Sequence, residues 1–161
     1  MRKKQILALV LVAAIIFGII VYLLLSGNDK NKLLKEVVLT NGVTYEELSF
    51  SANGLNPGDS CNYTLKLTAK NTGIYGIDLT FIEKKAGGLR DFIFVRVERD
   101  NAVNEYSLNE LFNGLTIGFN IEISRKIPTR IRIIFEMPQE VGNEAQGAES
   151  YFIVNLTAER V

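Results

Sequence analysis

The chemistry open to this chain is limited first by two residue types. The sequence contains no histidine and a single cysteine, Cys61. Without histidine, Ser-His-Asp catalysis, Cys-His catalysis and histidine-ligated zinc sites are excluded. A lone cysteine excludes an intrachain disulfide. Cys61 begins an alternating segment, which favours a small buried hydrophobic residue, and a reactive or cross-linking thiol is the alternative.

Carboxylate and amide oxygens are the remaining candidates for catalysis or metal binding. Glu46 and Glu47 are adjacent, but neighbours on a strand point to opposite faces, so we expect solvated charges and no acid/base pair. Two segments gather oxygen ligands of the kind that calcium takes, yet neither has the ordered spacing of a calcium loop. They are Asn53, Asn56 and Asp59 in one, and Asp100, Asn101, Asn104 and Glu105 in the other. We therefore expect no catalytic residue, no metal and no cofactor, with calcium as the less favoured alternative.

Two acceptor patterns for N-glycosylation occur, at residues 62–64 and 155–157. Both fall inside predicted strands, so coincidence is the favoured interpretation. The densest basic cluster is predicted to be a solvated strand face and turn, with a polyanion site as the alternative. It consists of Arg125, Lys126, Arg130 and Arg132.

The N-terminal segment is predicted to enter a membrane. Residues 6–25 are almost continuously apolar and follow Arg2, Lys3 and Lys4. About 20 helical residues span roughly 30 Å, the hydrocarbon thickness of a bilayer. The basic cluster favours a cytoplasmic N-terminus and an extracytoplasmic C-terminal domain. Residues 1–25 are expected to be an uncleaved anchor, because leucines occupy the place where a signal peptide has small residues. A cleaved signal, and hence a secreted protein, is the alternative.

Beyond the anchor, the chain divides into a polar spacer, residues 26–35, and one domain, residues 36–161. The three basic residues of the anchor leave 15 Lys and Arg against 18 Asp and Glu, a net charge of −3. A mildly acidic domain has no bulk electrostatic reason to bind nucleic acid.

Alternation of apolar and polar residues is the dominant pattern of the domain, and it predicts about eight short strands. Residues 61–70 are the clearest case, with Cys61, Leu65 and Leu67 expected to face inward. Residues 37–39 and 47–52 are expected to form a strand, a turn and a returning strand. Further strands are expected at residues 77–81, 92–99, 115–123, 129–136 and 152–158. The fold class is therefore all-β, an antiparallel β-sandwich.

One short helix interrupts the strands. Ser107 and Glu110 have the spacing of a capping box, in which each side chain satisfies a free backbone amide of the other. Leu111 and Phe112 are expected to pin this helix to the sandwich, and Gly114 to end it.

Three segments, in this order and spacing, resemble the camelysin/TasA family of surface and biofilm-matrix proteins of Gram-positive bacteria. Leu-Asn-Pro-Gly-Asp-Ser at residues 55–60 precedes a strand, and Lys-Asn-Thr-Gly at 70–73 follows it. Asn-Glu-Ala-Gln-Gly at 143–147 precedes the final strand. The similarity extends from Leu48 to the C-terminus. Its motif positions are Pro57, Gly58, Asp59, Asn71, Gly73, Asn143, Gln146 and Gly147.

The resemblance implies a jelly-roll-like fold, export, and a role at the cell surface, in the matrix or in fibres. This chain departs from the family in its anchor-like segment and lysine-rich spacer, where members have a cleavable signal and then a glycine-containing strand. Some members are described as metalloproteases, but a chain without histidine does not support that activity, and no catalytic residue is carried over.

The favoured hypothesis is a non-enzymatic surface or matrix protein that acts by partner binding or self-assembly. Its expected partners are the membrane, further copies of itself, or other surface and matrix proteins. Val37, Val38 and Leu39 form an apolar stretch that could complete a sheet of a neighbouring copy, and docking in its own domain is the alternative. An accessory ectodomain of a membrane complex is the second hypothesis. A histidine-free carbohydrate-active enzyme with two carboxylates in a cleft is the third.

Overall fold

The computed structural model describes residues 32–51, 55–85, 87–145 and 148–161. The predicted membrane segment and residues 26–31 of the predicted spacer lie outside the described residues. So do Asn53, Gln146 and Gly147, which belong to the predicted sites. Residues Leu33–Val161 form one compact unit.

The described part of the chain contains nine strands, one α-helix and two short 3-10 helices. The strands are β1 (Lys32–Leu39), β2 (Thr44–Ser51), β3 (Ser60–Ala69), β4 (Gly73–Lys85), β5 (Phe94–Arg99), β6 (Ala102–Ser107), β7 (Ile117–Ile123), β8 (Thr129–Glu136) and β9 (Tyr151–Arg160). The helices are η2 (Leu89–Asp91), α2 (Leu108–Phe112) and η3 (Gln139–Ala145).

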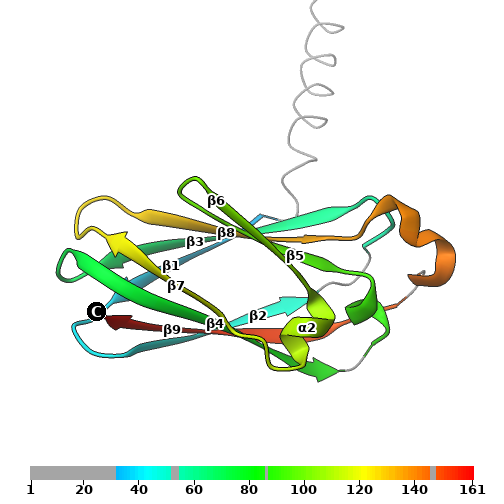
Figure 1. Cartoon of the computed structure of the whole chain (residues 1–161), viewed down its shortest axis with the longest axis horizontal. Coiled ribbons are helices and arrows are strands. Elements are labelled where there is room, and N and C mark those ends of the chain that lie inside the picture. Colours follow the sequence, from blue (N-terminus) through cyan, green and yellow to red (C-terminus); the bar gives the residue numbers. More distant parts are fainter. Residues whose placement is uncertain (1–31, 52–54, 86, 146–147) are drawn as a thin grey trace, which may run out of the picture. The chain divides into compact units, whose positions relative to one another are not determined.

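The strands form two packed sheets, which Figure 1 shows as two layers. One sheet has the order β1-β3-β8-β5-β6 and the other has the order β2-β9-β4-β7. The antiparallel pairs are nested along the chain: β2 with β9, β3 with β8, β4 with β7 and β5 with β6. This nesting is the strand arrangement of a jelly roll. The predicted all-β sandwich with one short helix is therefore confirmed.

The core consists of the inward faces of both sheets, as the alternation predicted. On β3, Cys61, Leu65 and Leu67 are buried, with exposed fractions of 5% or less. At one end of the sandwich the core is aromatic. Phe152 has four rings around it, with centroid distances of 5.2–6.4 Å: Phe50, Phe81, Phe112 and Phe135.

The predicted capping box is present at the start of α2. The Ser107 hydroxyl accepts a hydrogen bond from the Glu110 amide at 3.1 Å, and the Glu110 carboxylate accepts one from the Ser107 amide at 3.1 Å. Leu111 is fully buried and Phe112 contacts Phe152, so both attach the helix to the core as expected. Gly114 follows with φ of 100°, a conformation that glycine adopts without strain.

The predicted strand, turn and return at residues 37–52 is corrected in one respect. β1 and β2 do not pair with each other, since they lie in different sheets. The carbonyl of Leu39 accepts a hydrogen bond from the amide of Lys70, after β3, at 3.0 Å. The Thr40 amide donates to the Thr44 hydroxyl at 3.0 Å, so the turn bonds within itself while the chain crosses to the other sheet.

Two other sequence expectations are corrected. Residues 100–105, where no strand was predicted, contain most of β6, which was missed because its residues are largely exposed and show no alternation of burial. The domain begins earlier than residue 36, because β1 starts at Lys32 within the predicted spacer. The charged residues Lys35 and Glu36 of this edge strand form ion pairs, so a polar sequence is compatible with a strand here.

Candidate functional site

The stretch predicted to act in assembly, Val37 to Leu39, lies in the edge strand β1. β1 occupies the outer position beside β3. In three contacts between β1 and β3 or the residues just after them, the residue numbers increase in the same direction on both segments, so β1 runs parallel to β3. They are Glu36 with Lys66 at 3.2 Å, Leu39 with Lys70 at 3.0 Å and Asn41 with Asn71 at 2.6 Å. β1 is thus a parallel addition to strands whose pairings, among the described residues, are antiparallel.

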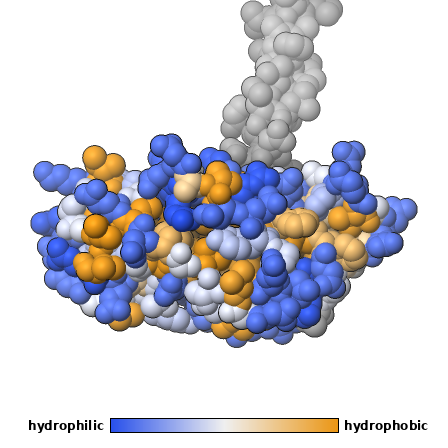
Figure 2. Space-filling model, viewed as in Figure 1, coloured by the Kyte–Doolittle hydropathy of each residue, from blue (hydrophilic) through white to orange (hydrophobic). Residues whose placement is uncertain are grey.

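The two faces of β1 have different surroundings. Val37 and Leu39 point into the core, with exposed fractions of 4% and 0%. Leu34 and Val38 point outward, with exposed fractions of 50% and 58%. On the face of the domain that Figure 2 shows, the apolar surface is broken into separate patches among hydrophilic atoms. In this structure the strand therefore fills a position at the edge of its own domain, and we call that position the β1 slot.

Two ion pairs hold β1 to its surroundings, one on each face. Lys35 lies 3.2 Å from Glu46 of β2, so this pair joins the two sheets at the open side of the sandwich. Glu36 lies 3.2 Å from Lys66 of β3 in the same sheet. Glu47, as predicted, is on the opposite face of β2 from Glu46 and takes no part. Neither the acid/base pair nor an isolated carboxylate cluster is formed here.

The motif at residues 55–60 forms a tight turn that leads into β3. The Asp59 carboxylate accepts hydrogen bonds from the backbone amide and side-chain amide of Asn56, at 2.9 and 3.0 Å. Gly58 has φ of 87° and donates its amide to the carbonyl of Met137 at 2.8 Å. The amide of Met137 in turn donates to the carbonyl of Asp59 at 3.0 Å. This turn therefore secures the start of β3 to the end of β8.

The second motif lies at the opposite end of the sandwich. Asn71 donates its side-chain amide to Asn41, and its carbonyl accepts a hydrogen bond from the hydroxyl of the buried Tyr75 at 2.9 Å. A Cβ at Gly73 would approach the Arg160 guanidinium to 2.9 Å, so glycine leaves room for that side chain.

The family-like positions therefore do not gather into one site. Pro57, Gly58 and Asp59 lie at one end of the strands, and Asn71 and Gly73 at the other. Asn143 is exposed in η3. The described motif residues serve as turns at strand ends, where their hydrogen bonds fix the connections.

The oxygen-rich segments do not form a calcium loop among the described residues. The Asp59 carboxylate is already engaged by Asn56. Asn104 accepts a hydrogen bond from Arg99, and Glu105 lies 3.7 Å from Arg96. Within the described ranges, no group of three or more Cys, Asp or Glu side chains is placed to hold a metal ion.

The predicted basic cluster is divided by the structure. Arg132 pairs with Glu98 of β5 at 2.9 Å, on the outer face of the five-stranded sheet. Arg125 and Lys126 are exposed in the turn between β7 and β8, where the Arg125 amide donates to the Thr72 hydroxyl at 3.1 Å. Arg130 is exposed on β8 opposite Lys66. The residues thus occupy a strand face and a turn, as the favoured interpretation had it.

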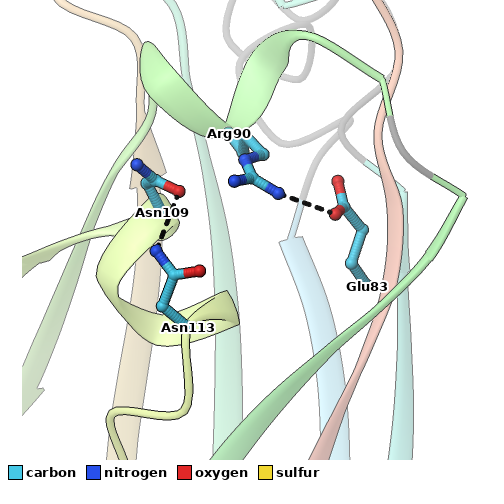
Figure 3. A network of polar contacts seen from close by, with 4 residues as sticks. All are labelled: Glu83, Arg90, Asn109 and Asn113. Carbon is cyan, nitrogen blue, oxygen red and sulfur yellow. Dashed lines mark hydrogen bonds and ion pairs between the residues drawn. The ribbon is translucent and has the colours of Figure 1, made fainter.

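Two further features were missed from sequence. Glu83 of β4 and Arg90 of η2 form a partly buried ion pair at 3.4 Å, which Figure 3 shows beside the Asn109–Asn113 hydrogen bond at the C-terminal end of α2. The pair holds η2 against β4.

An open groove of about 340 Å³ lies at the end of β9, where residues distant in sequence meet and no motif marks them. It is lined by Gly76, Asp78, Thr157, Glu159, Arg160 and Val161.

The predicted burial of Cys61 is confirmed. Burial raises the pKa of its thiol from 9.0 to about 11, against a smaller opposing effect of its hydrogen bond to Tyr63. Burial, together with the neighbouring Cys61, raises the pKa of Tyr63 from 10.0 to about 12. A thiol held in its neutral form is a poor nucleophile, so Cys61 is a core residue and not a reactive site.

These pKa shifts predict a loss of stability at high pH. Cys61 ionises near pH 9 when unfolded and near pH 11 when folded, so its contribution is complete below pH 9 and lost as the pH rises to 11. We expect the free energy of unfolding to fall by on the order of 2 kcal/mol over this interval. Urea denaturation at several pH values checks this, with Cys61→Ala as the comparison. Equal pH dependence of the two proteins would show that the thiol is not responsible.

No helix of the described residues is long and apolar enough to cross a membrane. The predicted anchor is not among them.

No protein-family model matches the chain, and no curated protein matches its sequence. Solved structures with a similar arrangement include the pre-peptidase C-terminal domain of a Bacillus anthracis collagenase, 9% identical, with a TM-score of 0.41 over 78% of this chain and 95% of that one. The CUB1-EGF-CUB2 domains of rat MASP-1 are 13% identical, with a TM-score of 0.41 over 78% and 43%. The lysozyme inhibitor PliG of Aeromonas hydrophila is 9% identical, with a TM-score of 0.36 over 80% and 99%. At these scores the similarities assign no family, and none of the three proteins is a camelysin or TasA.

Proposed function

We propose that this chain is a non-enzymatic module displayed on the outside of the cell membrane, and that its sandwich acts by joining other copies or other surface proteins. The observation that carries the proposal is the position of β1. The antiparallel nest from β2 to β9 is complete without it, and β1 adds in parallel at the edge. A strand added in this way can be exchanged for the same strand of another copy without rearranging the nest.

The location of β1 in the sequence supports the same proposal. It follows the predicted membrane segment in the sequence, so it is the strand nearest in sequence to the proposed attachment. The resemblance to the camelysin/TasA family, with its matrix and fibre subunits, agrees with assembly through an edge. Processing of the anchor would release the domain for growth of a matrix or fibre, whereas an intact anchor keeps it at the membrane.

An accessory ectodomain without assembly of its own is the second candidate. It is favoured by the burial of Val37 and Leu39 in their own domain, which leaves the β1 slot filled. The two candidates differ in whether the slot ever accepts a strand from another copy.

The test is to express the full chain in a Gram-positive host and analyse the membrane and the medium separately. Intact mass shows whether the N-terminal segment is retained, and sedimentation shows whether copies associate. Deleting residues 36–40 should abolish association while the domain keeps its β-sheet circular dichroism. Val38→Thr, which alters the same strand only on its exposed face, is the matched control and should associate normally. Association that persists undiminished after the deletion would overturn assembly through β1.

A further inference from the structure

Apolar residues lie on both faces of β1. Val37 and Leu39 face inward, but Leu34 and Val38 on the other face are apolar as well. Shifting a strand by one residue exchanges its two faces. After such a slip, Val38 would fill one of the two buried positions, while Thr40 or Glu36 would fill the other. The apolar pattern therefore disfavours a slip, and the charges beside it can add to this preference.

Two adjacent charges strengthen that preference. Lys35 faces the other sheet and pairs with Glu46, whereas Glu36 faces outward and pairs with Lys66. The two partners have opposite charges and lie in different sheets, so each position of the slot prefers one sign. Lys66 is also directly opposite Arg130 in the β3–β8 register, which makes the outer position more strongly selective for an anion.

A slip of one residue in either direction breaks both ion pairs and creates a repulsive contact. In one direction Glu36 comes to face Glu46. In the other direction Lys35 comes to face Lys66, beside Arg130. The repulsion thus disfavours both neighbouring registers, while only the observed register satisfies all four charges.

We propose that Lys35 and Glu36 form a charge key that, together with the buried Val37 and Leu39, sets the register of the strand in the β1 slot and selects which strand enters it. The slot accepts a strand that carries a cation followed by an anion, placed just before an apolar pair. The partner that fits is this same segment, either from its own chain or from a second copy. Selection of a second copy rests on the proposed function, whereas the setting of register within one chain does not.

The first experiment measures register within one chain. In the full chain with Cys61→Ala, cysteines replace Val38 and Thr68, which the observed register places side by side on the outer face. Mild oxidation should then form an intrachain disulfide, detected by intact mass. Adding Lys35→Glu and Glu36→Lys should slow its formation roughly tenfold, as expected for the loss of two ion pairs and a new repulsion.

Restoration of the charges separates the key from a general loss of stability. Adding Glu46→Lys and Lys66→Glu to the same protein should return disulfide formation to its original rate. Glu47→Lys, a charge reversal on the opposite face of β2, is the matched control and should leave the rate unchanged. An unchanged rate in the Lys35→Glu, Glu36→Lys protein, or a failure of the reversed slot to restore it, would overturn the proposal.

The second experiment measures selection between copies. Copies with Val38→Cys are mixed with copies carrying Thr68→Cys, both with Cys61→Ala. Strand exchange would give disulfide-linked pairs when strand and slot have matching charges, and about tenfold fewer when only one is reversed. Equal linkage of matched and mismatched copies would overturn selection by the key. If copies never link although the intrachain result holds, the key is supported and assembly by strand exchange is wrong.

Discussion

Phe152→Ala should destabilise the domain by about 3–5 kcal/mol. Phe152 is 1% exposed, and its ring lies within 6.4 Å of four other phenylalanine rings, between centroids. Removing it leaves a cavity that rings from both sheets and from α2 line together, so no single element can move in to fill it. Domains of this kind have a total stability of about 5–15 kcal/mol. The substitution is therefore expected to bring the domain close to unfolding at 37 °C.

Urea denaturation of residues 32–161, followed by circular dichroism, measures this change. Tyr151→Ala is the matched control, because the adjacent side chain points to the outer face and is 43% exposed. Its effect should stay below about 1 kcal/mol. Similar losses for the two variants would mean that the aromatic cluster is not the centre of the core.

The sequence predicted the strands that bury one face, because burial imposes alternation. β3 and β9 were found in this way, and the inward residues named on β3 are buried. β6 was missed, since an edge strand exposed on both faces carries no such alternation. The capping box was predicted because Ser107 and Glu110 are only three positions apart in the sequence, so their interaction does not depend on the rest of the fold.

The candidate site was only partly predictable for the same reason. The apolar stretch of Val37 to Leu39 marked an edge strand, and β1 is one. Its parallel direction and its sheet could not be foreseen, because a four-residue turn permits both a hairpin and a crossing between sheets. Lys66 lies 30 residues from Glu36, so their pairing depends on the fold. The charge key therefore emerged only when both sheets were in place.

Leu39→Asp should release β1 from its slot while leaving the remaining strands folded. Leu39 is fully buried, and a carboxylate there would lack a partner, at a cost of about 3–5 kcal/mol. The strand avoids this cost by leaving the core, because the pairs from β2 to β9 do not need it. Hydrogen exchange measures the result: the Lys70 amide, which donates to the Leu39 carbonyl, should lose protection.

Two comparisons are needed to interpret hydrogen exchange at the Lys70 amide: a charge on the exposed face of β1, and the amides of the other strand pairs. Val38→Asp places the same charge one residue away on the exposed face and should leave the Lys70 amide protected. In Leu39→Asp, amides of the β3–β8 and β4–β9 pairs should keep their protection, since those ladders remain closed. If they lose it together with Lys70, β1 belongs to the cooperative core, and a strand that cannot leave without unfolding its own domain cannot be exchanged with another copy. If only the edge opens, the slot can be emptied in a folded domain, which is the condition that assembly through β1 requires.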